Sequence, residues 1–383
     1  MEAMENITDP RTPVPAKGVP RAPVLKALTS LRFFAAMHVA LFHLVRPFSL
    51  WGPLAPVMSA GYVGVSFFFI LSGFILTYSH AAEYERGKGN ATTFWVARFA
   101  RIYPLYLLSM LFAGYTGFHY FRRPIHIIAY VADLLMIQSW SVRMVNFFHI
   151  TAWSLSVEMF FYLVFPFVLL RLRPDTRVKG CLAVCGFWLL AMVPPLACVL
   201  LKLDGSWREG GPQAIQVFRV HRLPALLLPE FLAGVSLGWI FLSFPLRPRL
   251  AKYLAPVGVL AFTVALFLSW HLPNVMIGNG LFIPLFSLII LGLSDRNWLS
   301  KALSASWLVL LGEASFALYL FHFLFNDWTM DRFGASSGLG AAVWKLAIVI
   351  PASVALHVFV ERPARRVILE RWSRRQAVHG AAH

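Results

Sequence analysis

Charged residues are scarce in this sequence, since Asp, Glu, Lys and Arg together make up only 13% of its 383 residues. Soluble domains carry about a quarter charged residues, so the deficit excludes an ordinary water-soluble fold. Hydrophobic residues make up 58% of the chain, and its mean hydropathy is +0.67. We therefore expect an all-α, polytopic bundle of transmembrane helices, because a helix satisfies its own backbone hydrogen bonds in lipid.

Acidic residues are few and cysteine is nearly absent. The chain has 17 acidic against 34 basic residues, which gives a formal net charge of +17. No RNA- or DNA-binding motif accompanies this excess, so it indicates basic loops that face anionic membrane lipids, and no nucleic acid partner. The three cysteines, Cys181, Cys185 and Cys198, lie in one apolar stretch without His or acidic neighbours at metal-ligand spacing. They predict neither a disulfide framework nor a metal site.

Long apolar runs divide the chain into membrane segments. A membrane-spanning helix needs about 20 mostly apolar residues. A polar, Pro-rich leader over residues 1–25 precedes the first run without a cleavage site after it, so we expect a retained helix and no removed signal peptide. A membrane domain over 26–366 and a basic cytoplasmic tail over 367–383 follow. The eleven candidate segments lie near 27–46, 61–80, 102–121, 124–140, 150–170, 181–202, 223–243, 253–270, 276–294, 307–325 and 341–360.

Lys and Arg in the connections predict the orientation, because basic loops face the cytoplasm. Three segments, an odd number, separate the basic loop ending at Arg101 from the one beginning at Arg171, which would put one loop on the wrong side. The shortest of the three, 124–140, carries Asp133, so we expect it to be re-entrant or interfacial. About ten helices then cross the membrane, with both termini in the cytoplasm. The other basic connections contain Arg86, Lys88 and Arg98; Arg173, Arg177 and Lys179; Arg247, Arg249 and Lys252; Arg296 and Lys301; and Arg362, Arg365, Arg366, Arg371, Arg374 and Arg375.

The first apolar segment contains three ionisable residues, Arg32, His38 and His43. Such residues cost free energy in lipid and indicate a functional site. Arg32 and His43 are eleven positions apart, so they return to within about 20° of one helix face, about 16 Å apart along the axis. The alternative is that Arg32 reaches the head groups while His43 makes a helix–helix hydrogen bond. His38 lies about 140° away from His43, and we expect it to be a packing residue.

Two arginines and one glutamate stand out in the following segments. Arg98 and Arg101 are three apart, hence on one face, at the expected start of a helix, where paired guanidiniums suit a phosphate-rich ligand. Both arginines are explained equally well as basic residues that flank a membrane helix on its cytoplasmic side. Glu158 lies among aromatic residues, so it needs a partner, and a His or Arg from another helix is expected. Glu230, Glu313 and Glu361 are expected to be structural pairs near helix ends.

These motifs occur in order, and together they resemble the membrane-bound acyltransferase 3 family over about residues 26–366. The resemblance implies a bacterial inner-membrane enzyme of about ten helices. It would transfer an acyl group, commonly acetyl from acetyl-CoA, to a hydroxyl of a carbohydrate or another acceptor such as a macrolide sugar. The motifs are Arg32 and His43 with ten residues between them, the run from Gly64 to Phe74, Arg98-x-x-Arg101 before Ile-Tyr-Pro, Trp153-Ser-Leu-Ser-Val-Glu158, Tyr319-Leu-Phe-His322 and Glu361-Arg-Pro.

The resemblance also implies residue roles. His43 corresponds to the family's essential histidine, Arg32 to its partner, Arg98 and Arg101 to the arginine motif for the donor, and Glu158 to the acidic motif. Some members carry a fused extracytoplasmic domain, which we do not expect here. We expect the substrate path to include Ser72, Gly73, Trp153, Ser154 and His322. Helix packing is the alternative role of the glycine taken individually, and it explains His322 equally well.

The expected chemistry needs a base and an activated acyl group. Imidazole titrates in the right range to take a hydroxyl proton. The thioester of acyl-CoA is already activated, so no bound cofactor or metal is expected. Direct transfer and an acylated side chain are both open. The alternative function is a proton-coupled transporter or flippase of a polar or lipid-linked substrate, which would use intramembrane His, Glu and Arg but need not consume acyl-CoA.

Overall fold

The fold is built from helices. The computed structural model describes residues 23–45, 47–117, 123–203, 217, 219–295, 297–333 and 338–380, and in these ranges it contains helices and no strand. Most of the expected leader therefore lies outside the described residues, as does Arg296 of the expected basic connections. The expected all-α fold class is confirmed.

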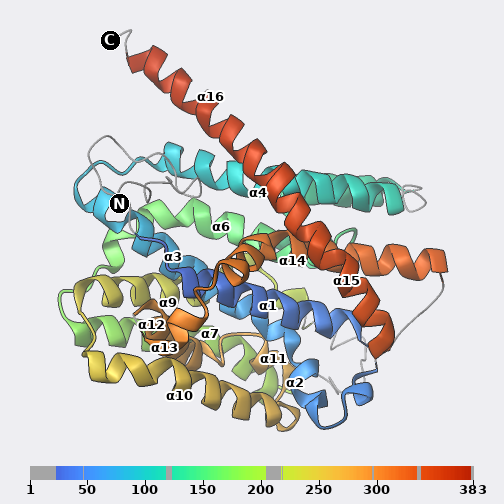
Figure 1. Cartoon of the computed structure of the whole chain (residues 1–383), viewed down its shortest axis with the longest axis horizontal. Coiled ribbons are helices and arrows are strands. Elements are labelled where there is room, and N and C mark those ends of the chain that lie inside the picture. The colour runs from blue at the N-terminus through green and yellow to red at the C-terminus, as the bar shows by residue number, and fades with distance from the viewer. Residues whose placement is uncertain are drawn as a thin grey trace, which may run out of the picture.

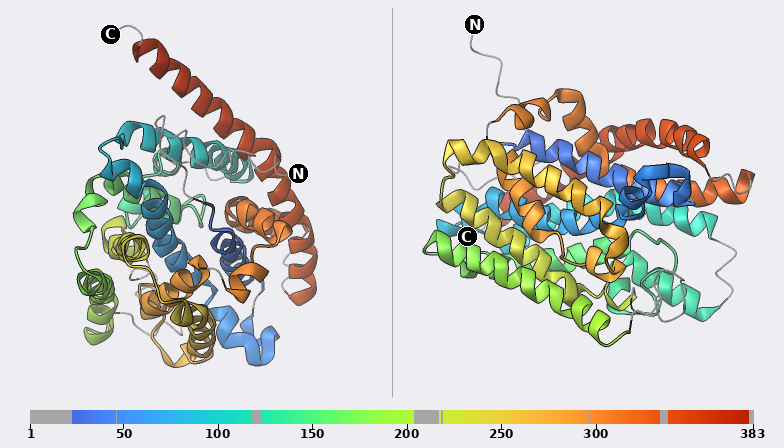
Figure 2. Two further views of the ribbon diagram at one scale, coloured as in Figure 1. Left: turned by 60° about the vertical axis from the view of Figure 1, so that its left-hand side comes forward. Right: turned by 90° about the horizontal axis from the view of Figure 1, so that it is seen from below.

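Eight helical stretches in the described residues are long and apolar enough to cross a membrane. They confirm a polytopic membrane protein, whose long helices run side by side in a bundle (Figures 1 and 2). They are α1 (Lys26–Leu44), α3 (Gly64–Glu85), α4 (Ala91–Thr116), α7 (Arg177–Leu200), α9 (Pro224–Ser243), α10 (Pro248–Phe267), α14 (Ser306–Phe333), and α15 (Leu339–Leu356), which continues through a π-helical turn η7 (His357–Glu361) into α16 (Arg362–Gly380).

Three apolar helices are shorter, namely α5 (Pro124–Leu134), α6 (Trp153–Val168) and α12 (Ile283–Ser294). The expected single segment 276–294 is broken, because Gly280 has a φ of +79° and separates α12 from the short α11 (Asn274–Ile277). A glycine adopts that conformation without the penalty a side chain would impose. The remaining short elements are η1 (Phe48–Leu54), α2 (Ala55–Ser59), η2 (Gly61–Val63), η4 (Gln138–Trp140), η5 (Leu170–Leu172), η6 (Ser269–His271) and α13 (Trp298–Ala302).

Helix α4 begins earlier than expected. Its N-cap is Asn90, whose side chain accepts a hydrogen bond from the backbone N–H of Thr93 at 2.8 Å. Such a cap satisfies one of the free N–H groups of the first turn. The start predicted at 102 is therefore wrong, and Arg98 and Arg101 lie well inside the helix. The expected tail from 367 onward is also helical, because α16 continues to Gly380.

Close helix contacts hold the bundle together. Helix α1 packs against α14, α3 against α9, α7 against α9, and α10 against α12. The contact between α3 and α9 uses small residues: a Cβ atom on Gly73 would lie 2.2 Å from the carbonyl oxygen of Phe231, and one on Gly234 only 2.0 Å from that of Ile70. Side chains at these positions would push the helices apart, so Gly73 serves packing.

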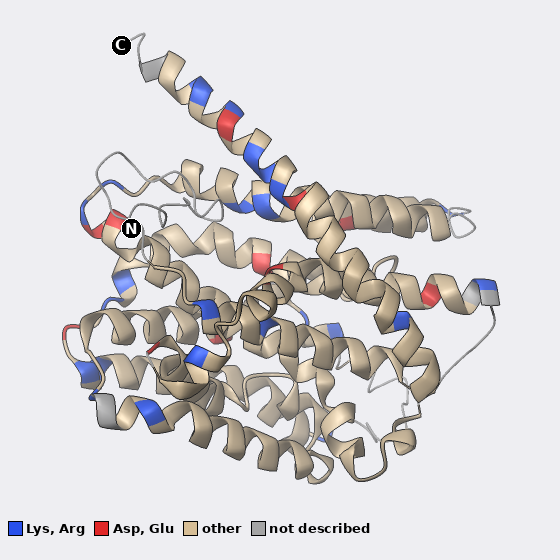
Figure 3. Cartoon of the chain, in the orientation of Figure 1, with Lys and Arg blue, Asp and Glu red and all other residues tan. Residues whose placement is uncertain are grey.

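Three basic connections meet at one end of the bundle. Arg173 forms a salt bridge with Glu85 at 2.9 Å, which joins the connection before α7 to the end of α3. Arg177 donates hydrogen bonds to the carbonyl oxygens of Phe244 and Pro245, at 3.2 and 2.8 Å. Figure 3 shows many of the Lys and Arg residues at this end. The loops on either side of α4, α5 and α6 therefore lie together, and α5, with 11 residues, is shorter than the roughly 20 residues that a membrane-spanning helix needs.

Single cysteines test this topology. On a background without Cys181, Cys185 and Cys198, we expect Lys88→Cys and Asp175→Cys to resist an impermeant thiol reagent added to intact cells and to react after permeabilisation. Both side chains are exposed in the two loops that meet at one end. Ser49→Cys, beyond the far end of α1, is the control that should react from outside. If only one of the two loops were labelled from outside, the 124–140 segment would have to cross the membrane.

Candidate active site

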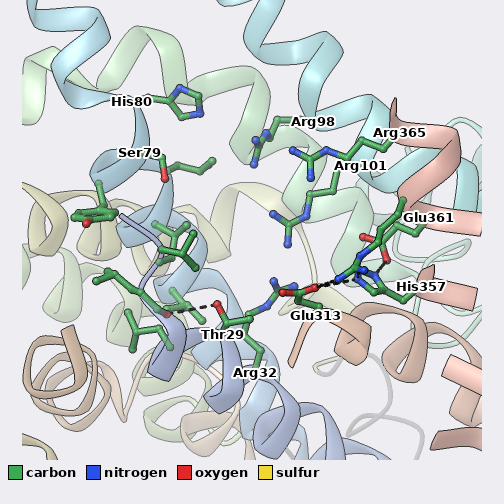
Figure 4. Close-up of a pocket in the computed structure, with 18 of the residues that line it drawn as sticks. Thr29, Arg32, Ser79, His80, Arg98, Arg101, Glu313, His357, Glu361 and Arg365 are labelled. Carbon is green, nitrogen blue, oxygen red and sulfur yellow. Dashed lines mark hydrogen bonds and ion pairs between the residues drawn. The ribbon is translucent and has the colours of Figure 1, made fainter. Parts of the chain in front are cut away.

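Two adjoining cavities share a wall of three arginines. The outer cavity is lined by α1, α3, α4, α14, η7 and α16, and the inner one by α1, α3, α4, α6 and α14. Arg32, Arg98 and Arg101 line both. Figure 4 shows these side chains, from α1 and α4, around the same space. The three arginines therefore border both cavities.

The shared arginines give both cavities a positively charged wall. Arg98 is only 5% exposed, and its Nε atom has no hydrogen-bond partner among the described residues. Its guanidinium lies 5.6 Å from the ring centroid of Phe94. Burying several cations together is costly unless an anion compensates them. Guanidinium groups match phosphate oxygens with paired donors, so a phosphate ligand fits this position.

Glu158 lines the inner cavity and is held by hydroxyl groups. Its Oε1 accepts hydrogen bonds from Ser72 Oγ at 3.1 Å and from the Tyr162 hydroxyl at 2.5 Å. Tyr162 lies one turn along α6, and Ser72 comes from α3. The expected partner from another helix is an arginine, since Arg32 and Arg98 interact electrostatically with Glu158, but its hydrogen bonds come from these two hydroxyls. Glu158 thus lies near the arginines of the cavity and apart from His43, which lines neither cavity.

The wall of the inner cavity includes a pair of hydroxyl groups. Ser154 Oγ and the Tyr319 hydroxyl lie 2.7 Å apart, and Tyr319 donates to the carbonyl oxygen of Thr151 at 3.0 Å. Tyr319 belonged to a motif in the sequence but had no predicted role. His322 lies one helical turn further along α14, and its ring centroid is 6.0 Å from that of Tyr319.

His43 and His322 form a hydrogen-bonded pair. His43 Nδ1 lies 3.0 Å from His322 Nε2, and His322 Nδ1 lies 3.1 Å from the carbonyl oxygen of Leu318. A carbonyl only accepts, so Nδ1 of a neutral His322 carries the proton and its Nε2 accepts. His43 then donates from Nδ1, which leaves the lone pair of its ring on Nε2. Because His322 is fully buried, the pair has a defined geometry.

The other predicted residues lie at different places. Ser72 and Ser154 line the inner cavity, whereas Gly73 and Trp153 do not. The guanidinium of Arg222 lies 4.5 Å from the ring centroid of Trp153. His38 Nε2 bonds to the carbonyl oxygen of Val57 at 2.8 Å, as a packing residue would.

A cluster in the wall of the outer cavity was only partly expected. Glu313 Oε2 accepts from Arg362 and contacts His357 Nε2 at 3.3 Å, and His357 Nδ1 lies 2.8 Å from Glu361 Oε2. This confirms that Glu313 and Glu361 form structural pairs. The arginines of α16 in this wall were assigned only to a basic flank, because no sequence spacing connects α16 with α4. Among the described residues, no group of three His, Cys, Asp or Glu is arranged to hold a metal.

Comparison with known proteins gives a consistent result. A family model described as an acyltransferase domain matches residues 25–362. The chain is 31% identical to the acyltransferase MdmB of Streptomyces mycarofaciens, over 91% of this chain and 94% of that protein. It is 26% identical to the O-acetyltransferase OatA of Staphylococcus aureus, over 89% of this chain but 57% of that longer protein. A putative O-acetyltransferase of Staphylococcus aureus strain COL is 24% identical, and the chain spans 50% of its length. No solved structure matches.

Proposed function

Since the chain belongs to the membrane-bound acyltransferase 3 family, we propose that it transfers an acyl group, typically acetyl, from acyl-CoA to a hydroxyl of a carbohydrate or glycoside acceptor. One observation supports this most strongly. The arginine wall at the basic end of the bundle leads through the inner cavity to Tyr319, one helical turn from the His43–His322 pair. The site thus combines an anion-binding entrance with a base at depth.

The donor would enter with its phosphates at the arginines. Arg32, Arg98 and Arg101 would bind the diphosphate through charge-assisted hydrogen bonds. The pantetheine arm would extend into the inner cavity, whose wall includes Phe68, Leu71 and other apolar side chains. The distance from Arg32 to His43 along α1 is about 16 Å, which an extended arm can cover. Because acyl-CoA is cytoplasmic, the basic end of the bundle would face the cytoplasm of a bacterial inner membrane.

His43 would act as the general base. In direct transfer, its Nε2 takes the proton of the acceptor hydroxyl while the oxygen attacks the thioester carbonyl carbon. The C–S bond then breaks, the proton passes to the departing thiolate, and an ester and free CoA result. His322 would position the imidazole by accepting the Nδ1 proton, and Glu158 would balance the charge of the neighbouring arginines. Tyr319 and Ser154 would contact the thioester end of the donor.

The direct test is transfer by the purified protein. It would be incubated with acetyl-labelled acetyl-CoA and a panel of glycans and glycosides. We expect a labelled ester and one free CoA thiol per ester formed. A folded protein that neither binds nor consumes acetyl-CoA with any acceptor would contradict the proposal and favour the transporter alternative.

The arginines provide a more local prediction. We expect Arg98→Ala and Arg101→Ala each to weaken CoA binding by about tenfold to a hundredfold, because each removes charge-assisted hydrogen bonds to phosphate. Lysine at either position should rescue only part of the loss, since it lacks the fork of donors. Isothermal calorimetry measures both effects, and exposed Arg86→Ala is the matched control. Unchanged binding in both alanine variants would remove these residues from the donor site.

A further inference from the structure

The π-helical turn η7 lies between α15 and α16, and such turns are rare and often occur at functional sites. In an α-helix, residues five positions apart lie about 140° apart around the axis, so their side chains do not meet. A π-helical turn bonds residue i to residue i+5, which brings these two positions together. Here they are His357 and Arg362, and Arg362 Nε donates a hydrogen bond to His357 Nε2 at 3.0 Å. The turn therefore makes possible a contact that a regular helix would not allow.

The guanidinium of Arg362 is held at two of its nitrogens. Besides the bond from Nε to His357, its Nη2 donates to Glu313 Oε2 on α14. Because His357 Nε2 accepts, the ring proton lies on Nδ1, which donates to Glu361 Oε2 at 2.8 Å. The side chains of Glu313, His357 and Glu361 are at most 8% exposed. Buried groups of the bundle thus fix the orientation of this guanidinium.

The third nitrogen of Arg362, Nη1, has no hydrogen-bond partner among the described residues. The side chain is 41% exposed and lines the outer cavity together with Arg98 and Arg101. Figure 4 shows His357 and Glu313 beside the space around which Arg98 and Arg101 lie. A tie between α14 and α16 would explain the two bonds, but it would not explain why Arg362 lines this cavity. A guanidinium that is already ordered loses little side-chain entropy when it binds an anion.

We propose that Arg362 binds a phosphate group of the acyl-CoA donor and that His357 is the residue that positions it, an inference that rests on the proposed function. Arg362 lines the outer cavity only, whereas Arg98 and Arg101 line both cavities. Arg362 would therefore contact the nucleotide part of the donor and stay away from the acyl group. A phospholipid head group offers the same phosphate chemistry, so the experiment has to separate these two sources.

The test measures CoA affinity by calorimetry on the full-length protein in phosphatidylcholine nanodiscs. We expect Arg362→Gln to bind CoA about tenfold more weakly, because it loses charge-assisted hydrogen bonds to phosphate. His357→Leu, which cannot accept from Arg362 Nε, should bind at least threefold more weakly. His357→Gln keeps an acceptor oxygen and should stay within about twofold of the wild type. Arg371→Gln, exposed on α16 and outside the cavity lining, makes the same charge change and should have no effect.

A double-mutant cycle shows whether His357 acts through Arg362. Arg362→Gln/His357→Leu should bind CoA no more weakly than Arg362→Gln alone, because the partner that His357 positions is already absent. In turnover, Arg362→Gln should raise the KM for acetyl-CoA about tenfold and change kcat by less than about twofold. Additive losses of affinity in the cycle would remove the positioning role of His357.

The outcomes also separate this inference from the proposed function. If the wild type binds no CoA and transfers no acetyl group, the proposed function itself fails. If the wild type does both and Arg362→Gln binds CoA equally well, the phosphate site is wrong and the proposed function stands. A lower melting temperature with unchanged CoA affinity would make the cluster a structural tie. Loss of a bound phospholipid in native mass spectrometry, again with unchanged CoA affinity, would assign Arg362 to lipid.

Discussion

We expect His43→Ala to lower the turnover number by about a hundredfold or more, with the protein still folded and inserted. General-base catalysis contributes about a hundredfold to ten-thousandfold, and alanine removes the base entirely. Donor binding should change little, because His43 lines neither of the cavities that hold the arginines. Steady-state kinetics with acetyl-CoA and an acceptor, together with CoA binding by calorimetry, measure both quantities.

A second histidine on the same helix provides the control. His38 lies on the same helix as His43, and its Nε2 bonds to the carbonyl oxygen of Val57. His38→Gln keeps a donor at this position, so its turnover should stay within about threefold of the wild type. Turnover close to that of the wild type in His43→Ala would show that another group takes the proton.

The fold could be predicted where long apolar runs correspond to single helices. Segments such as 181–202 and 223–243 lie within a few residues of α7 and α9. The prediction failed where a local feature overrides hydropathy. Asn90 starts α4 before its apolar stretch, and Gly280 interrupts the run that ends in α12. Neither feature changes the mean hydropathy of a 20-residue window, so that measure cannot detect them.

The sequence could predict which residues belong to the candidate site, but not which of them are in contact. Ionisable side chains in apolar segments identified Arg32, His43 and Glu158, because lipid makes them costly. Their partners come from distant helices. His43 bonds to a residue 279 positions away, and Ser72, which bonds Glu158, is 86 positions away from it. Helix periodicity relates residues within one helix only, so it gave no information on these pairs.

The structure also places the residues proposed to bind the donor apart from the histidine pair proposed to take the proton. The sequence did not separate these two roles. The arginines and Glu158 line the cavities, whereas the two histidines line neither cavity, and His322 lies one helical turn from Tyr319. A variant at the entrance should therefore change donor affinity, and a variant at the histidine pair should change turnover.

We expect His322→Leu to lower kcat by about a hundredfold while the KM for acetyl-CoA changes by less than about threefold. In the wild type, Leu318 fixes the proton of His322 on Nδ1, so its Nε2 accepts from His43 and keeps the His43 lone pair on Nε2. Leucine has a similar size but accepts no hydrogen bond, so His43 can turn or take the other tautomer. Holding a catalytic imidazole in the wrong tautomer has cost about four orders of magnitude in a serine protease.

Glutamine at the same position distinguishes positioning from packing. Its side-chain oxygen can accept a hydrogen bond from Nδ1–H of His43. The kcat of His322→Gln should therefore be at least about tenfold higher than that of His322→Leu. A merely structural role would predict the reverse, because His322 is fully buried in α14 and an apolar side chain of similar volume would be tolerated best there. Equal kcat values for the two variants, or a loss seen mainly in KM, would therefore leave His43 as the base but remove His322 as the residue that orients it.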